Sequence, residues 1–265
     1  IYTTIKTSKP WVQFGISPFG VWRNQAMDPK GSPTRAGLTN YDDLFADPLT
    51  WMRKGWIDYL IPQIYWSMEH PLASYRKLND WWSNNSHGTN IYVGNGPYKI
   101  RENSDAAWKI PSELNNQVHY SRTLPSIQGN AFFSAKSLYF KNKDVANLLR
   151  KEVYDKPALP PSFEPKSTVN LEIPVVLAAE SNLVSTTLNL EKPLDPAIRY
   201  AMVQGSVDLN LLHDAVIHLV WVGRNRARSI EIPSLNASFI AIRWIDHFGR
   251  IVQTQVFEIP NSSKP

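Results

Sequence analysis

Four prolines within ten residues, from Lys156 to Pro165, divide this chain of 265 residues. Proline fixes φ and lacks a backbone N–H, so such a run continues neither a helix nor an internal strand. We therefore expect a linker over residues 156–166 between two domains, residues 1–155 and 167–265. Eight of the ten tryptophans and ten of the eleven tyrosines precede this linker. Because aromatic rings contribute strongly to ligand contacts, we expect the function to lie in the first domain.

Strand-like and helix-like stretches alternate four times before the linker, a pattern typical of βα units on a parallel sheet. The expected strands cover residues 11–17, 57–65, 90–94 and 130–134. The expected helices run from about Tyr41 to Gly55, from Pro71 through Trp82, from Pro111 to about Leu124, and from Asp144 to Val153 after an Asn142 cap. Pro62 argues against a central position for the second strand, because it cannot donate to a neighbouring strand.

Seven short alternating or β-branched runs follow the linker, separated by turn residues. They cover residues 171–178, 185–190, 198–203, 215–222, 228–232, 239–245 and 250–259. About seven strands in about a hundred residues predict a β-sandwich. The segment from Asp246 to Gly249 predicts a hairpin turn between the last two strands.

Composition and motif spacing exclude several classes of function. The chain has no cysteine, which excludes a disulfide scaffold and a thiolate site, and its six histidines show no short metal-ligand spacing. No dinucleotide or phosphate-loop motif is present, so we expect neither metal nor cofactor. The net charge of +5 is not concentrated in a basic run, which argues against nucleic acid as a partner. No apolar stretch approaches the roughly 18 residues of a transmembrane helix.

Ligand-contacting groups collect beyond the carboxyl ends of parallel strands. Amides, aromatic rings and cations follow all four expected strands, which suits a carbohydrate: rings stack on sugar C–H faces and amides bridge hydroxyls. The alternative is that these rings only cap a hydrophobic core. The predicted ligand-contacting residues are Trp22, Arg23, Asn24, Gln63, Tyr65, Trp66, Asn95, Tyr98 and Lys136.

Hydrolysis of a glycosidic bond usually needs two carboxylates. Glu69 alone lies close to an expected strand end, and it is the one candidate catalytic acid. Asp42 and Asp43 are explained without function if they occupy the first turn of a helix, where the dipole favours acids. Glu102 and Asp105 follow the third strand and either overhang the site or belong to a solvated loop.

Five stretches resemble the glycosyl hydrolase-like 10 family. They are residues 11–24 (WVQFGISPFGVWRN), 41–47 (YDDLFAD), 56–66 (WIDYLIPQIYW), 92–98 (YVGNGPY) and 129–134 (GNAFFS). They are similar to the last four strands of that family's (β/α)8 TIM-type barrel, and residues 239–257 resemble the closing hairpin of a fibronectin type III-like sandwich. The resemblance implies an α/β half of a barrel followed by an all-β, immunoglobulin-like domain.

The resemblance also implies a carbohydrate-active protein of bacteria, exported to the periplasm or cell surface, with some relatives acting on peptidoglycan glycan. The family's acidic motifs at the fourth barrel strand have no counterpart here, so we expect a glycoside hydrolase fragment that is inactive by itself. The alternatives are a non-catalytic carbohydrate-binding protein and a partner-binding protein. An open half barrel is expected to pair with a second copy or with the N-terminal barrel half, through strands 11–17 and 130–134.

Overall fold

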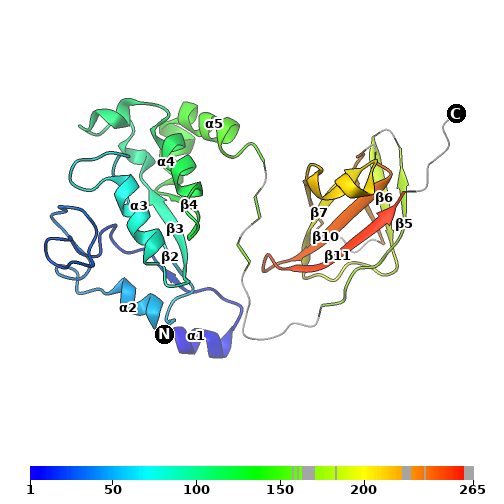
Figure 1. Cartoon of the computed structure of the whole chain (residues 1–265), viewed down its shortest axis with the longest axis horizontal. Helices are drawn as coiled ribbons and strands as arrows, with labels where there is room; N and C mark the ends of the chain where they lie inside the picture. Colours follow the sequence, from blue (N-terminus) through cyan, green and yellow to red (C-terminus); the bar gives the residue numbers. More distant parts are fainter. Residues whose placement is uncertain are drawn as a thin grey trace. The chain divides into compact units, whose positions relative to one another are not determined.

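The computed structural model describes residues 1–156, 158–159, 161–162, 171–182, 184–222, 228–235 and 237–259. The chain separates into two compact units, residues 1–156 and 157–265 (Figure 1). Most of the expected linker, including Pro157, Pro160 and residues 163–166, lies outside the described residues.

A parallel four-stranded sheet organises the first unit. Its strands are β1 (Gly15–Ile16), β2 (Tyr59–Leu60), β3 (Asn90–Asn95) and β4 (Ile127–Phe132). They lie in the order β1-β2-β3-β4, and every neighbouring pair is parallel. The predicted α/β class and the sequential strand order are therefore confirmed.

Five α-helices accompany this sheet. They are α1 (Tyr2–Ser8), α2 (Pro48–Arg53), α3 (Tyr75–Asn84), α4 (Glu113–Arg122) and α5 (Lys143–Glu152), with short helical segments η1 (Pro97–Lys99), η2 (Ala106–Lys109) and η3 (Ser137–Lys141). Figure 1 shows α3 and α4 alongside β3 and β4. The core contains Leu60, Leu78, Trp82, Ile91 and Val93, none of which is exposed.

One local prediction of a helix boundary is wrong. The helix expected from Tyr41 begins only at Pro48, because Asp47 accepts a hydrogen bond from the Thr50 N–H and so caps α2. Asp42 and Asp43 therefore precede the helix, and its dipole does not explain them. Asn142 occupies the N-cap position of α5 as expected, but its side-chain oxygen accepts from Arg101 at 3.4 Å and not from the helix backbone. Gly55 does end α2 as expected, with φ +62°.

The objection raised by Pro62 does not hold. Pro62 lies just beyond β2, and its carbonyl oxygen accepts the Gly94 N–H at 2.9 Å. The backbone N–H groups on either side, of Ile61 and Gln63, both donate toward the β1 segment. Because Pro62 lies outside β2, that strand still pairs with β1 on one side and β3 on the other.

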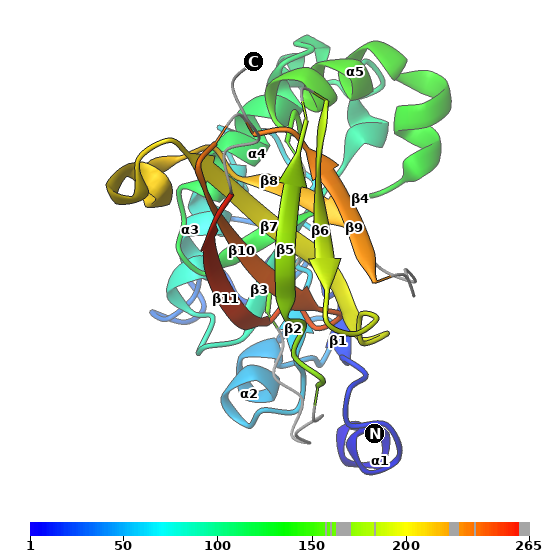
Figure 2. The ribbon, with the colours of Figure 1, turned by 90° about the vertical axis from the view of Figure 1, so that its right-hand side faces the viewer.

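The second unit consists of two antiparallel sheets. Its elements are β5 (Val176–Ser181), β6 (Ser185–Leu190), β7 (Ile198–Ser206), η4 (Leu209–Asp214), β8 (His218–Trp221), β9 (Ser229–Pro233), β10 (Phe239–Asp246) and β11 (Ile251–Glu258). The sheet orders are β11-β10-β7-β8 and β5-β6-β9, and Figure 2 shows the two layers overlapping. Leu188, Ala201, Ile240 and Trp244 belong to the shared core. All seven expected strands are present, and the predicted hairpin has Gly249 at φ +77°.

No helix in the described part of the chain is both long enough and apolar enough to cross a membrane.

Candidate functional site

The carboxyl ends of all four parallel strands meet at one rim of the sheet. Backbone hydrogen bonds continue the sheet past the short strands: the Gln63 N–H donates to Pro18, the Gly94 N–H to Pro62, and the Phe133 N–H to Asn95. The segments after β1, β2, β3 and β4 therefore start side by side. This is the arrangement that the strand order predicts for a ligand-binding rim.

Three aromatic rings from three different strand ends contact one another at this rim. Tyr65 follows β2, Tyr98 lies in η1 after β3, and Phe133 follows β4. The ring centroids of Tyr65 and Tyr98 are 5.8 Å apart, those of Tyr65 and Phe133 6.2 Å, and those of Tyr98 and Phe133 6.2 Å. We call these residues the rim cluster. Phe133 is 62% exposed and the two tyrosines are half-buried, so the cluster presents ring surface to solvent.

Partial burial raises the pKa of the Tyr65 and Tyr98 hydroxyls above the usual value, and the nearby Tyr98 raises that of Tyr65 further. Both rings are therefore neutral at physiological pH. Gly96 allows the close approach of these rings, because an added Cβ would lie 3.2 Å from Tyr65 Cβ and 3.2 Å from Tyr98 Cε1. A larger residue at position 96 would push the two rings apart.

Three other predicted residues also lie at the rim. The Gln63 amide donates to the Ser17 carbonyl oxygen at 3.0 Å, which fixes it between the β1 and β2 ends. Trp66 is half-buried and packs edge-on against Phe19, with ring centroids 5.5 Å apart. Lys136 is exposed just after β4. These residues remain candidates for ligand contact.

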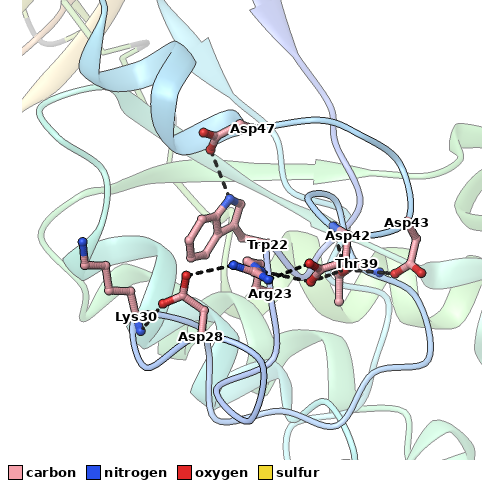
Figure 3. Close-up of polar contacts among 8 residues, drawn as sticks. All are labelled: Trp22, Arg23, Asp28, Lys30, Thr39, Asp42, Asp43 and Asp47. Carbon is pink, nitrogen blue, oxygen red and sulfur yellow. Dashed lines mark hydrogen bonds and ion pairs between the residues drawn. The ribbon is translucent and has the colours of Figure 1, made fainter.

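Arg23 holds the long loop between β1 and α2 in place. Its guanidinium donates to both carboxylate oxygens of Asp42, at 3.0 and 2.7 Å, and to Asp28 at 3.0 Å (Figure 3). The paired bonds from Arg23 lower the pKa of Asp42, although partial burial opposes the shift. Asp43 accepts the Thr39 N–H at 2.7 Å in the same cluster. The acids that the sequence could place only in a helix turn therefore anchor this loop.

Three predicted ligand contacts are instead buried or internally satisfied. Trp22 is 5% exposed, donates to Asp47 at 3.1 Å and stacks on Trp81. The Asn24 amide bonds the backbone of Ala36 on both its oxygen and its nitrogen. Asn95 is fully buried. In this structure these three side chains bond or pack within the protein, and their contact with a ligand stays a prediction.

The acids near the rim each have a structural partner. Glu69 forms an ion pair with Arg76 at 2.7 Å and its side chain is 68% exposed. Glu102 pairs with Lys141. Asp105 accepts a hydrogen bond from the Ser67 hydroxyl at 2.5 Å and caps η2. Burial raises the pKa of Asp105, but these hydrogen bonds outweigh burial and hold the pKa below its usual value. A carboxyl that ionises so readily is a poor general acid.

Sequence reasoning missed two residues of this region. Phe133 fell inside the strand expected over residues 130–134, whereas β4 ends at Phe132 and releases Phe133 to the rim. The Phe132-Phe133 pair was a usable signal, because only one of two adjacent side chains can face a single side of a strand. Glu113 was also missed: it is 5% exposed, burial raises its pKa, and it accepts the Met68 N–H. The polar residues around it in the sequence, Ser112, Asn115 and Asn116, gave no sign of this burial.

The sequence of this chain is similar to a family and to individual proteins described as glycosyl hydrolases. Residues 1–110 match the family described as glycosyl hydrolase-like 10. The glycosyl hydrolase YngK of Bacillus subtilis (strain 168) is 47% identical over 165 residues, which cover 62% of this chain and 32% of YngK. The glycosyl hydrolase DigH of Escherichia coli (strain K12) is 41% identical over 137 residues, covering 49% of this chain and 31% of DigH.

A solved structure, the spore cortex lytic enzyme SleM of Clostridium perfringens, overlaps 77% of this chain and 68% of its own, at 10% identity and a TM-score of 0.26. The chain spans about a third of the length of the two curated relatives. Over residues 1–110, this chain is therefore similar to the glycosyl hydrolase-like 10 family.

Proposed function

We propose that the first unit supplies the glycan-binding rim of a glycoside hydrolase that acts on a polysaccharide or on peptidoglycan glycan. The observation that carries this proposal is the rim cluster: three rings from the ends of β2, β3 and β4 touch one another and remain partly exposed. Neutral rings with open faces suit the C–H faces of sugar rings. Gln63, Trp66 and Lys136 add polar and aromatic contacts at the same rim.

Binding and hydrolysis make different demands on this rim. A glycosidase places two carboxylates around the scissile bond, one of them protonated. Among the described acids near the rim, Glu69 is exposed and paired with Arg76, while Asp105 is held ionised. We therefore propose that the chain of residues 1–265 binds glycan without cleaving it, and that Glu69 is the candidate acid of a complete enzyme.

Exported proteins of the bacterial periplasm or surface meet such glycans, so we propose that location for the whole protein. The second candidate function is a non-catalytic carbohydrate-binding protein. The rim cluster favours it equally, because stacking on rings needs no carboxylate. Turnover by a longer protein that contains this chain separates the two candidates.

Isothermal titration with soluble glycan strands from purified peptidoglycan, and with cellulose oligosaccharides, tests the proposal. Phe133→Ala is expected to weaken binding about tenfold, or about 1.4 kcal/mol. Tyr139→Ala is the matched control, because Tyr139 is 70% exposed and lies outside the rim cluster. Equal affinities for the two variants and the unaltered chain, or no binding of either glycan, would contradict the proposal.

Release of reducing ends from the same glycans tests the proposal that the chain does not cleave glycan. The unaltered chain and Glu69→Gln are expected to release no more than a protein-free blank. Release that Glu69→Gln abolishes would show instead that the chain is a complete hydrolase.

A further inference from the structure

A chain of buried hydrogen bonds runs from the start of α4 to the loop behind the rim cluster. Glu113 Oε1 accepts the Met68 N–H at 2.8 Å and the Gln117 side-chain amide at 2.9 Å. The same Gln117 nitrogen donates to the Trp66 carbonyl oxygen at 3.1 Å. Two side chains of α4 therefore hold two backbone groups of the loop after β2.

The chain continues into the sheet. Gln117 Oε1 accepts the Asn95 amide at 2.8 Å, and Asn95 Oδ1 accepts the Asn130 amide at 2.8 Å. Asn95 also donates to the Tyr75 hydroxyl at 3.0 Å. Glu113, Gln117 and Asn95 are at most 5% exposed. Buried polar groups lose much free energy when a partner is removed, so such a network strongly favours one arrangement.

Each segment that bears a ring of the rim cluster is bonded to this network. Trp66 and Met68 lie one and three residues after Tyr65. Asn95 lies three residues before Tyr98, and Asn130 lies three residues before Phe133. A network that only stabilised the core would need hydrogen bonds between helices and strands and none to a loop. The bonds to the Trp66 carbonyl oxygen and the Met68 N–H instead hold a loop.

We infer that Glu113 and Gln117 are positioning residues that set the rings of the rim cluster at the spacing needed to stack on a glycan. The ligand part of this inference rests on the function proposed above. Neither residue contacts the ligand, because both side chains are buried behind the loop.

Amide hydrogen exchange of the unliganded chain tests the positioning directly. Glu113→Met keeps the side-chain length but removes the acceptor, so the Met68 amide is expected to exchange at least tenfold faster while Ile91 and Val93 of β3 stay unchanged. Glu113→Gln keeps Oε1 and is expected to restore protection. Glu152→Met is the matched control, since Glu152 also accepts a bond from α4, from Asn115, but is exposed.

Glycan titration of the same four proteins completes the test. Glu113→Met is expected to weaken binding about tenfold, with Glu113→Gln and Glu152→Met close to the unaltered chain. Unchanged exchange at Met68 in Glu113→Met would overturn the inference, as would equal acceleration at Met68 and Val93, which marks a merely structural role. An unaltered chain that binds no glycan contradicts the proposed function, whereas the exchange result stands independently of it.

Discussion

The side chains at this rim fall into two groups: those that are exposed to a ligand and those that bond to neighbouring loops and strands. Arg23 has the residue type of a ligand contact, yet its guanidinium donates hydrogen bonds to Asp28 and Asp42 of its own loop. Phe133 has no such internal polar role and is 62% exposed. Residue type alone does not separate the two groups; burial and partners do.

Replacing Arg23 is expected to loosen the loop between β1 and α2. Arg23→Lys keeps the charge but cannot make the paired bonds to Asp42, because an ammonium group lacks the planar fork of a guanidinium. Limited proteolysis should therefore cleave Arg23→Lys within residues 24–46 faster than the unaltered chain. Arg53→Lys, at an exposed arginine of α2, is the control. Equal cleavage rates in all three proteins would show that the Arg23 bonds do not hold the loop.

Glu113 is expected to make stability depend on pH. Burial raises its pKa, Asp105 and Glu69 raise it further, and hydrogen bonds from Met68 and Gln117 oppose the shift. A carboxyl whose folded pKa is above its unfolded value favours folding while it is protonated, so this contribution is lost as pH rises from about 4.5 through the folded pKa.

Urea unfolding from pH 4 to pH 8 measures that contribution as a difference. Glu113→Gln cannot ionise, so the free energy of unfolding of the unaltered chain should fall relative to this variant as pH rises. Subtracting the variant removes the opposite pH dependence of acids with lowered pKa, such as Asp42 and Asp144. A difference that is independent of pH would mean that the pKa of Glu113 is the same folded and unfolded.

At the scale of elements, the sequence predicts which helices and strands exist better than it predicts the residues at which they begin and end. Continuous apolar runs and β-branched alternation located all four parallel strands and all seven strands of the second unit. The start of α2 was misplaced because Asp42 and Asp43 resemble a helix start, while the tertiary bonds to Arg23 and Thr39 that explain them are invisible in one sequence. The helix α1 was not expected.

The position of the candidate site could be predicted from the sequence, but not which side chains are exposed there. Strand ends gave the rim, and Gln63, Tyr65, Trp66, Tyr98 and Lys136 lie there. The burial of Asn95 could not be foreseen, because it depends on Tyr75 and Gln117 from two separate helices. Nothing local distinguishes an amide that faces solvent from one that completes a buried network.

A pair of glycines tests how α2 ends. Gly55 has φ +62° and Gly37 has no positive φ, yet an added Cβ meets nothing within 4 Å at either. Gly55→Ala should therefore destabilise the chain by about 1–2 kcal/mol through backbone strain alone. Gly37→Ala should stabilise it by about 0.4–1 kcal/mol. Urea midpoints that shift equally in both variants would exclude strain at Gly55.

At the scale of the whole molecule, the first unit has two open strand edges. Among the described residues, β1 pairs only with β2, and β4 pairs only with β3. Apolar cavities adjoin both edges: one of about 410 Å³ includes Phe14, Ile16 and Trp56, and one of about 650 Å³ includes Phe132 and Tyr154. Open edges beside apolar surface favour pairing with another chain.

We therefore expect association through these edges, with a second copy or with an N-terminal barrel half. Light scattering with mass spectrometry should give a particle heavier than the 30.2 kDa chain. A monodisperse 30.2 kDa monomer without an accompanying peptide would refute this expectation.

The central claim is that the rim cluster is the surface that meets glycan. Backbone amide shifts of the labelled chain during titration with soluble peptidoglycan glycan strands measure it most directly. The account predicts saturable shifts at Tyr65, Gly96, Tyr98 and Phe133, with the β-sandwich unchanged. Shifts confined to the second unit, or none at glycan concentrations that saturate binding, would contradict it.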